Sequence, residues 1–313
     1  MNTRKIGIIG AGHVGSHVGF ALATQGEVDE LILIDCDQKK ATAQALDISD
    51  AVSYLPHHVT SYGGEYQDLL GADCVVICVG PPSGPSEDRL DELEELVSVL
   101  DDVLPKLQES GFDGFIINIS NPADVITTYI QSYLEYPKEK ILSTGCVLDS
   151  ARLQSQLSKL LEVNRQSIQA CCLGEHGFSA MIPWSHVTIS GQPLEAYLSA
   201  QDLAALNYEQ VLQETKDGGY QVLLGKGSTE FGIATALVEV IKSIFHDERK
   251  VLPVSVYLDG QFGQEGIFAS VPAVIGKNGV ERLVEWQLST GEQVDFEQSC
   301  EIIRGNFAKI HTF

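Results

Sequence analysis

The chain has 313 residues, of which 44% are hydrophobic and 20% are charged. These proportions are typical of a globular protein and exclude an intrinsically disordered one. The 20 Lys and Arg residues and the 43 Asp and Glu residues give a formal net charge of −23, which repels phosphate backbones and anionic lipid and so argues against nucleic-acid and membrane partners. The length is sufficient for two domains, for which we expect the boundaries 1–144 and 145–313.

In the first half of the chain, short apolar runs alternate with helical patterns. The apolar runs predict strands at residues 5–9, 31–34, 74–79 and 115–119. Helices are expected at about 14–25, 38–54 and 89–108. Near-continuous apolar strands separated by helices are typical of a parallel sheet that is covered on both faces. With right-handed crossovers, this pattern predicts an α/β fold with a Rossmann-type doubly wound parallel sheet.

A glycine-rich turn, Gly10-Ala-Gly12-His-Val14-Gly15, follows the first predicted strand and opens the first predicted helix. In a G-x-G-x-x-G motif at this place, the glycines allow a tight turn, a close approach of the backbone to a pyrophosphate, and packing of helix on strand. The diphosphate then binds the free N–H groups at the start of the helix.

An acidic residue, Asp35, stands at the tip of the second predicted strand. Its carboxylate can accept hydrogen bonds from ribose hydroxyls and, with Asp37, repels a 2′-phosphate. We therefore expect NAD rather than NADP as the cofactor, bound by Gly10, Gly12, Val14, Gly15 and Asp35. The motif alone leaves open FAD, or a module that only binds the nucleotide.

From about residue 145 onward the pattern is mixed. Helices are expected near 148–161, 200–216 and 228–245 and after residue 290, and strands near 253–257 and 267–275. This half therefore predicts a mixed α+β substrate domain. No linker rich in Pro, Gly or Ser separates the two halves.

The seven cysteines show no paired spacing that would indicate a zinc site or a disulfide framework. Cys74 and Cys78, for example, lie in an apolar run, where a thiol acts as a small buried hydrophobe. Free buried thiols suit a reducing cytosol, and the N-terminal apolar stretch is interrupted at Gly10 before it could form a signal peptide. We expect a cytoplasmic protein without a bound metal.

Further short motifs follow the glycine-rich turn in a fixed order. They are Ser86-Glu-Asp-Arg89, Ser120-Asn121-Pro122-Ala-Asp124, Leu148-Asp149-Ser-Ala-Arg152, Gly174-Glu-His176-Gly177 and Gly225-Lys226-Gly227-Ser-Thr229. The same order occurs in L-lactate and other L-2-hydroxyacid dehydrogenases of the lactate/malate dehydrogenase superfamily. The chain resembles this family from about Lys5 to its last helix, and is most similar to the L-2-hydroxyisocaproate dehydrogenase branch.

Reduction of a 2-oxo acid needs a hydride from the nicotinamide, a proton for the developing alkoxide, and a group that binds the carboxylate. His176 is the best candidate for the proton donor, because imidazole titrates near neutral pH. Arg152 lies three residues after Asp149 on the same helix face. Its guanidinium can bind a carboxylate through two parallel hydrogen bonds, which lysine cannot reproduce. Asn121, before Pro122 at a strand end, could contact substrate or ribose.

The resemblance implies roles for further residues. Asp149 corresponds to the carboxylate that fixes the tautomer of the catalytic histidine; the alternative is a helix N-cap. Arg89 corresponds to a catalytic arginine that polarises the substrate carbonyl when its loop closes; the alternative is a solvated arginine that pairs with the acidic run 91–95. Thr229 corresponds to a threonine of the substrate pocket. The cofactor site includes Gly80 as well as Asn121.

Four positions differ from the usual pattern of the family. Ser83 stands where lactate enzymes carry glutamine and malate enzymes carry arginine, so we expect it in a substrate site that disfavours malate and accepts a larger apolar side chain, as in 2-oxoisocaproate. Phe178 replaces an acid after His-Gly and adds apolar surface nearby. Gln154 and Gln169 replace the arginine and histidine of enzymes activated by fructose 1,6-bisphosphate, so we expect no such activation.

The sequence thus predicts an NAD-dependent L-2-hydroxyacid dehydrogenase that transfers a hydride reversibly between NADH and a 2-oxo acid. The resemblance implies a homo-oligomer, either a dimer or a tetramer. Two alternatives stay open: an ordinary L-lactate dehydrogenase, which differs only in pocket size, and a catalytically silent NAD-binding sensor, which would not need the acid–base pair of Asp149 and His176. A short-chain reductase would need a helical Tyr-x-x-x-Lys, and the segment that matches this spacing, residues 136–140, contains Pro137.

Overall fold

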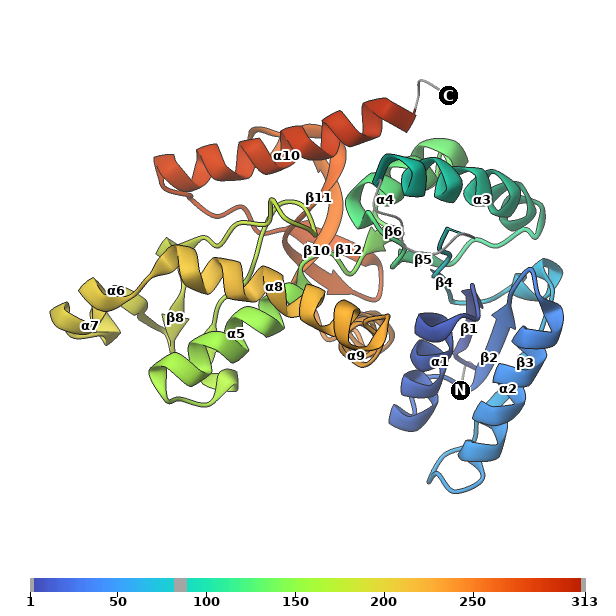
Figure 1. Cartoon of the computed structure of the whole chain (residues 1–313). Helices are drawn as coiled ribbons and strands as arrows, with labels where there is room; N and C mark the ends of the chain where they lie inside the picture. The colour runs from blue at the N-terminus through green and yellow to red at the C-terminus, as the bar shows by residue number, and fades with distance from the viewer. Residues whose placement is uncertain (1–2, 82–88, 311–313) are drawn as a thin grey trace.

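The computed structural model describes residues 3–81 and 89–310, with the backbone alone for residues 89–91 (Figure 1). Its strands are β1 (Lys5–Ile9), β2 (Glu30–Ile34), β3 (Thr60–Gly63), β4 (Cys74–Ile77), β5 (Phe115–Asn118), β6 (Ile141–Ser143), β7 (Ile168–Gln169), β8 (Thr188–Ile189), β9 (Gln192–Pro193), β10 (Lys250–Asp259), β11 (Glu265–Gly276) and β12 (Gly279–Leu283). Its helices are α1 (His13–Gln25), α2 (Gln38–Val52), α3 (Arg89–Glu109), α4 (Ala123–Leu134), α5 (Val147–Leu161), α6 (Leu194–Tyr197), α7 (Ala200–Ala205), α8 (Tyr208–Lys226), α9 (Phe231–Phe245) and α10 (Thr290–Ile310).

Strands from both halves of the chain form one large sheet in the order β12-β11-β10-β6-β5-β4-β1-β2-β3. The six strands from β1 to β6 are parallel, so their order is that of a doubly wound Rossmann fold, as the sequence predicted. The antiparallel strands β10, β11 and β12 extend the sheet beyond β6, where Ser255 pairs with Ser143. A separate small sheet holds β7, β8 and β9.

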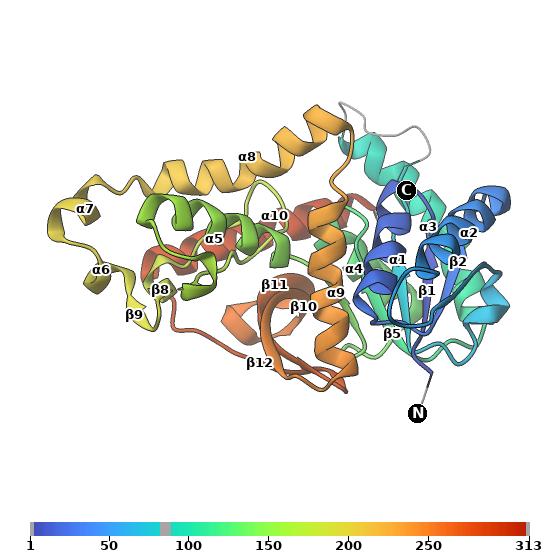
Figure 2. The same cartoon turned by 90° about the horizontal axis from the view of Figure 1, so that it is seen from below.

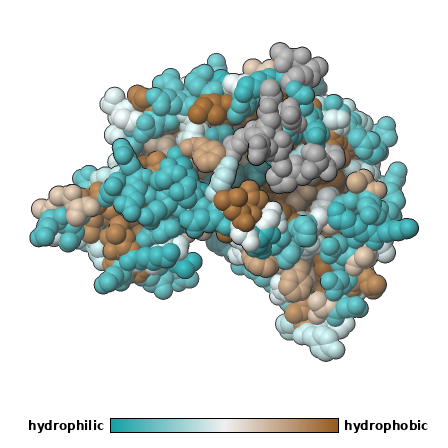
Figure 3. Space-filling view, viewed as in Figure 1, coloured by the Kyte–Doolittle hydropathy of each residue, from teal (hydrophilic) through white to brown (hydrophobic). Residues whose placement is uncertain are grey.

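Apolar side chains of the parallel strands are buried because helices cover both faces of the sheet. In β4, for instance, all four residues are buried, and right-handed crossovers place α1 and α2 on one face and α3 and α4 on the other (Figure 1). Hydrophilic residues cover most of the face shown in Figure 3. Within the described ranges, no helix combines the length and the apolar character that crossing a membrane requires.

The strands and helices expected in the first half are present, but the sequence did not predict β3, β6 or α4. In the second half, the helix expected at 200–216 was wrong as a single element. It is divided into α7 and α8 because the Asn207 side chain accepts a hydrogen bond from the backbone N–H of Gln210 and so begins a new helix. Helix α8 then runs to Lys226 and ends at Gly227, which has a left-handed φ of 87°.

The strand order reverses between β1 and β4, and in sheets of this type the crevice at that point binds ligands. The segments that follow β1, β4 and β5 carry Gly10, Gly80 and Asn121 respectively. Helix α9 packs against α1 at this edge, and Figure 2 shows α9 between the parallel strands and the helices of the second half. The fold therefore brings the expected cofactor residues close to the second half of the chain.

Candidate active site

At the end of β1 the backbone lies so close to β4 that only glycine fits. Gly10 has a φ of 103°, and a Cβ atom there would lie 2.2 Å from the carbonyl oxygen of Cys78. A Cβ on Gly15 would lie 1.9 Å from the carbonyl oxygen of Gly10, so the third glycine of the motif is also required for packing. At Gly12 the nearest atom would be Lys40 Nζ, at 3.9 Å, which leaves the backbone accessible to a pyrophosphate. These features fit a dinucleotide.

The Asp35 carboxylate is fixed between the glycine-rich turn and α2. Its two oxygens accept hydrogen bonds from the backbone N–H groups of Ala11 at 2.8 Å and Asp37 at 3.0 Å. Burial alone would raise the pKa of Asp35, but these N–H groups and Lys40, whose Nζ lies 3.4 Å away, hold it below its ordinary value. Asp35 is therefore ionised at neutral pH, as ribose recognition requires.

Two neighbours of Asp35 differ from what the sequence suggested. The Asp37 carboxylate caps α2 by accepting hydrogen bonds from the N–H groups of Lys39 and Lys40. The Lys40 ammonium, which sequence reasoning did not consider, lies beside Asp35 and near Gly12. Its positive charge offsets part of the repulsion that Asp35 and Asp37 would exert on a 2′-phosphate.

A buried amide, Asn118 at the end of β5, shapes the turn that carries Asn121. The Asn118 side chain donates hydrogen bonds to the carbonyl oxygens of Ser120 and Ala123 and accepts one from the N–H of Ser120. Asn121 itself is exposed at the carboxyl end of the sheet, where an amide is available to a ligand. Gly80, after β4, is also exposed, and Val14 is partly buried in the first turn of α1.

The link between α8 and α9 carries Thr229 to the same edge of the sheet. The Glu230 carboxylate accepts a hydrogen bond from Ser228 Oγ at 2.5 Å and forms an ion pair with Lys226. These two contacts hold together the ends of the short segment that contains Thr229. His13, the first residue of α1, places its Nδ1 3.9 Å from Glu230 Oε1. The partly buried Thr229 thus lies in a segment that borders the glycine-rich turn.

The loop that holds His176 begins at Gly174, a position where the structure requires glycine. Gly174 has a φ of 89°, and a Cβ there would lie 2.3 Å from Ser299 Oγ. Its N–H and carbonyl groups each form a 2.9 Å hydrogen bond with the backbone of Ser270 on β11. Ser299 Oγ in turn accepts a hydrogen bond from the N–H of Glu175. Strand β11 and helix α10 therefore fix the backbone that carries His176.

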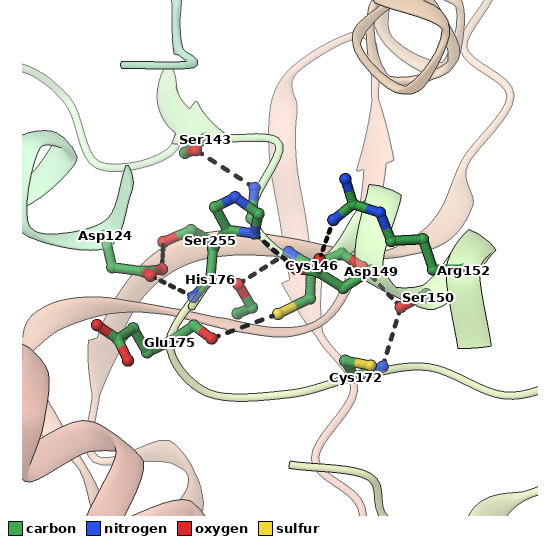
Figure 4. Close-up of polar contacts among 12 residues, drawn as sticks. Asp124, Ser143, Cys146, Asp149, Ser150, Arg152, Cys172, Glu175, His176 and Ser255 are labelled. Atoms are coloured by element: carbon green, nitrogen blue, oxygen red, sulfur yellow. Dashed lines mark hydrogen bonds and ion pairs between the residues drawn. The ribbon is translucent and has the colours of Figure 1, made fainter. Parts of the chain in front are cut away.

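A chain of polar contacts joins His176, Asp149 and Arg152 (Figure 4). His176 Nδ1 lies 2.6 Å from Asp149 Oδ2, and Arg152 Nη1 donates to Asp149 Oδ1 at 2.9 Å. Asp149 lies in the first turn of α5, but the N-cap residue is Cys146. The Asp149 carboxylate therefore binds His176 and Arg152 and does not cap the helix. With Nδ1 engaged by Asp149, Nε2 of His176 is left as the ring nitrogen that can exchange a proton with a substrate.

Each charged group among His176, Asp149 and Arg152 affects the protonation of its neighbours. The Asp149 carboxylate, more than any other group, raises the pKa of His176 to about 9. Burial would raise the pKa of Asp149, but His176 and Arg152 together lower it. At neutral pH the structure therefore holds an imidazolium and a guanidinium on one ionised carboxylate, which is a favourable surrounding for an anionic substrate.

A residue that sequence reasoning quoted but gave no role, Asp124, supports His176 from the other side (Figure 4). This fully buried carboxylate accepts hydrogen bonds from the N–H of His176 at 2.7 Å and from Ser255 Oγ at 2.5 Å. Burial raises the pKa of Asp124 to about 6. Asp124 thereby connects α4, the His176 loop and β10. The sequence motif that holds Asn121 and Pro122 also holds Asp124, but the sequence predicted neither helix α4, which begins there, nor the partner Ser255.

Other expected residues have the following places. Ser83 lies outside the described residues, and Arg89 is described only as the first backbone position of α3. The Phe178 ring, 49% exposed, lies 5.3 Å from the ring of Tyr220 on α8. Gln169 Oε1 accepts a hydrogen bond from Thr188 Oγ1, and Gln154 Nε2 donates to the carbonyl oxygen of Ala170.

The Tyr-x-x-x-Lys match at residues 136–140 lacks the helix that a short-chain reductase site needs. Tyr136 follows the end of α4 rather than lying in a helix, and its hydroxyl donates to the carbonyl oxygen of Gly114. Lys140 Nζ donates to the carbonyl oxygen of Asp113. Across residues 3–81 and 89–310, no group of three or more His, Cys, Asp or Glu residues is arranged to hold a metal ion.

Comparisons with known proteins agree over almost the whole chain. Residues 4–143 match the family model of the lactate/malate dehydrogenase NAD binding domain, and residues 146–313 match that of the lactate/malate dehydrogenase alpha/beta C-terminal domain. An L-lactate dehydrogenase of Fusobacterium nucleatum is 37% identical over 306 residues, which are 97% of this chain and 96% of that protein. An L-lactate dehydrogenase 3 of Bacillus anthracis is 37% identical over 305 residues, with the same coverage of both chains.

Solved structures give the same result. The minor L-lactate dehydrogenase of Enterococcus mundtii in its ligands-bound form superposes with a TM-score of 0.92 at 31% identity, covering 98% of both chains. MGS-M5, a lactate dehydrogenase enzyme from a Medee basin deep-sea metagenome library, superposes with a TM-score of 0.93 at 29% identity, covering 99% of this chain and 100% of that one.

Proposed function

Because the chain belongs to the lactate/malate dehydrogenase family, we propose that it is an L-2-hydroxyacid dehydrogenase in which His176, Asp149 and Arg152 form the catalytic centre. It is an NAD-dependent oxidoreductase that acts on 2-hydroxy acids, and NAD is its cofactor, as the sequence predicted. The observation that carries the proposal is the chain of contacts from His176 through Asp149 to Arg152, with distances of 2.6 and 2.9 Å.

Each residue of the site has a separate role in the reduction of a 2-oxo acid. Bound NADH supplies the hydride. His176, kept protonated by Asp149, gives a proton from Nε2 to the oxygen that becomes the hydroxyl, and it takes that proton back in the reverse direction. Arg152 uses Nη1 on Asp149 and binds the substrate carboxylate with its other N–H groups. Arg89 polarises the carbonyl, and Asn121 and Thr229 line the substrate site.

The cofactor residues also belong to the proposal. Gly10, Gly12, Val14 and Gly15 hold the diphosphate, Asp35 binds the ribose, and Gly80 and Asn121 complete the site. The absence of side chains at Gly10 and Gly15 and the open space at Gly12 support the first of these roles. The ionised state of Asp35 supports the second.

The substrate that we propose is a 2-oxo acid with an apolar side chain larger than methyl. Ser83 is shorter than the glutamine of lactate enzymes, and the exposed pair of Phe178 and Tyr220 adds apolar surface beside the His176 loop. The second candidate is pyruvate, as for an L-lactate dehydrogenase, and it is favoured by the names of the relatives. We also propose, from the family resemblance, that the protein is cytoplasmic and forms a homo-oligomer, either a dimer or a tetramer.

A parallel assay distinguishes the candidates: NADH oxidation with pyruvate, 2-oxoisocaproate, phenylpyruvate and oxaloacetate at matched concentrations. We expect kcat/KM for 2-oxoisocaproate to exceed that for pyruvate by about tenfold or more, since each buried methylene contributes about 0.8 kcal/mol. Oxaloacetate should be poor, because Ser83 offers its second carboxylate no cation. A much higher kcat/KM with pyruvate would identify an ordinary L-lactate dehydrogenase, and NADH binding without turnover of any acid would identify a silent sensor.

A further inference from the structure

A second buried carboxylate, that of Asp124, lies beside His176 on the side away from Asp149 (Figure 4). Asp124 is 1% exposed, and each of its oxygens has its own partner. Oδ2 accepts a hydrogen bond from the backbone N–H of His176 at 2.7 Å, and Oδ1 accepts one from Ser255 Oγ at 2.5 Å. The roles proposed for 2-oxo acid reduction do not include Asp124, although a carboxylate is costly to bury.

The contacts of Asp124 favour its ionised form. A backbone N–H can only donate, so Oδ2 must remain an acceptor to keep its contact with His176. Burial raises the pKa of Asp124 to about 6, while the hydrogen bonds from Ser255 and His176 act in the opposite direction. Asp124 also lies in the first turn of α4, where the helix dipole favours a negative charge. At neutral pH and above, Asp124 is therefore ionised.

The charged groups around the His176 ring come from α5, α4 and the loop itself. Helix α5 supplies Asp149 and Arg152, α4 supplies Asp124, and the loop supplies Glu175, whose charge acts on Asp124. Asp149 is the largest cause of the raised pKa of His176. Asp124 raises that pKa further, whereas Arg152 lowers it. The imidazolium is thus stabilised by two carboxylates rather than one.

Helix α4 holds the Asp124 carboxylate in place through contacts with two strands of the second half. Ser255 on β10 donates to Asp124, and Thr128, one turn further along α4, accepts a hydrogen bond from the backbone N–H of Phe268 on β11 at 3.1 Å. The carboxylate therefore has a fixed position on the sheet, from which it can hold the backbone of the His176 loop.

We propose that Asp124 is a positioning residue for proton transfer: it holds the backbone of His176 through Oδ2 and, as a second negative charge, helps Asp149 to keep the imidazole ring protonated. Asp124 acts on the substrate only through His176. This inference therefore rests on the proposed role of His176 as the proton donor.

Asp124→Asn tests the charge, because it keeps the size of the side chain. The pH profile of kcat/KM for 2-oxo acid reduction should then fall at a pH below the wild-type value of about 9 and above 6.5, since Asp149, the larger cause, is still present. The amide nitrogen cannot accept a hydrogen bond, so kcat at neutral pH should also fall by roughly three- to tenfold. KM for NADH should stay at the wild-type value.

Asp73→Asn is the matched control. The Asp73 carboxylate also accepts a hydrogen bond from a backbone N–H, that of Lys5 at 2.8 Å, but it lies before β4, at the edge of the sheet opposite the glycine-rich turn. This variant should keep the wild-type pH profile and kcat.

Ser255→Ala tests the anchoring and decides the matter if Asp124→Asn does not fold. It removes one partner of Asp124 but leaves the carboxylate, which is ionised near pH 9. We expect kcat to fall severalfold while the profile still breaks near 9, and thermal unfolding to show that the variant is folded at the assay temperature.

A break at the wild-type pH in Asp124→Asn would overturn the inference, and so would an unchanged kcat in Ser255→Ala. Wild-type protein that reduces none of the 2-oxo acids, or turnover that survives in His176→Ala, would contradict the proposed function itself. An active wild type that depends on His176 but is indifferent to Asp124→Asn would contradict the role of Asp124 alone.

Discussion

His176→Ala should lower kcat for 2-oxo acid reduction by roughly 10²-fold or more, the usual scale for removal of a general acid, while NADH binding stays close to that of the wild type. The structure gives the reason. His176 Nδ1 is engaged by Asp149 at 2.6 Å, so the ring can present a proton to the substrate only from Nε2. Steady-state turnover and fluorescence titration with NADH measure the two quantities.

His58→Ala is the matched control, because His58 is exposed between α2 and β3 and far in sequence from the site. It should leave both quantities unchanged. If NADH affinity collapses together with turnover in His176→Ala, the histidine maintains the fold of its loop, and its assignment as proton donor is wrong.

Arg152→Lys should raise KM for 2-oxo acids by about 10- to 100-fold, the range expected when a charge-assisted hydrogen bond is lost. Lysine keeps the positive charge and can still pair with Asp149, but it has no planar pair of N–H groups for the substrate carboxylate. KM for NADH should not change. Arg165→Lys, at an exposed position after α5, is the control for the substitution itself, and an unaltered KM in Arg152→Lys would contradict the role in carboxylate binding.

Much of the fold could be predicted from the sequence, because parallel strands buried on both faces leave continuous apolar runs such as that around Cys74. The glycine-rich turn and the helix spacing of Asp149 and Arg152 are local signals of the same kind. The extension of the sheet by β10, β11 and β12 was not predictable. The pairing of Ser255 with Ser143 joins segments far apart in the chain, and neither serine carries a sign of it.

The same limit applies to the candidate site. The contacts of Asp124 with Ser255 and the N–H of His176 exist only once α4, β10 and the His176 loop are packed together. Lys40 was overlooked for another reason: its position at the start of α2 is local, but a lysine on a helix surface has no pattern that marks it as a neighbour of Asp35.

The pH dependence of kcat/KM tests most directly whether His176, held by Asp149, supplies the proton. Reduction needs the protonated ring, and the pKa of His176 is raised to about 9, chiefly by Asp149. The rate of reduction should therefore be level below about pH 9 and fall as the pH rises through that value, whereas oxidation of the 2-hydroxy acid, which needs the neutral ring, should rise over the same range. In Asp149→Asn the main cause of the raised pKa is absent, so the fall should move down toward 6.5, the ordinary value for histidine. A profile with the same break in the wild type and in Asp149→Asn would contradict this role for the pair.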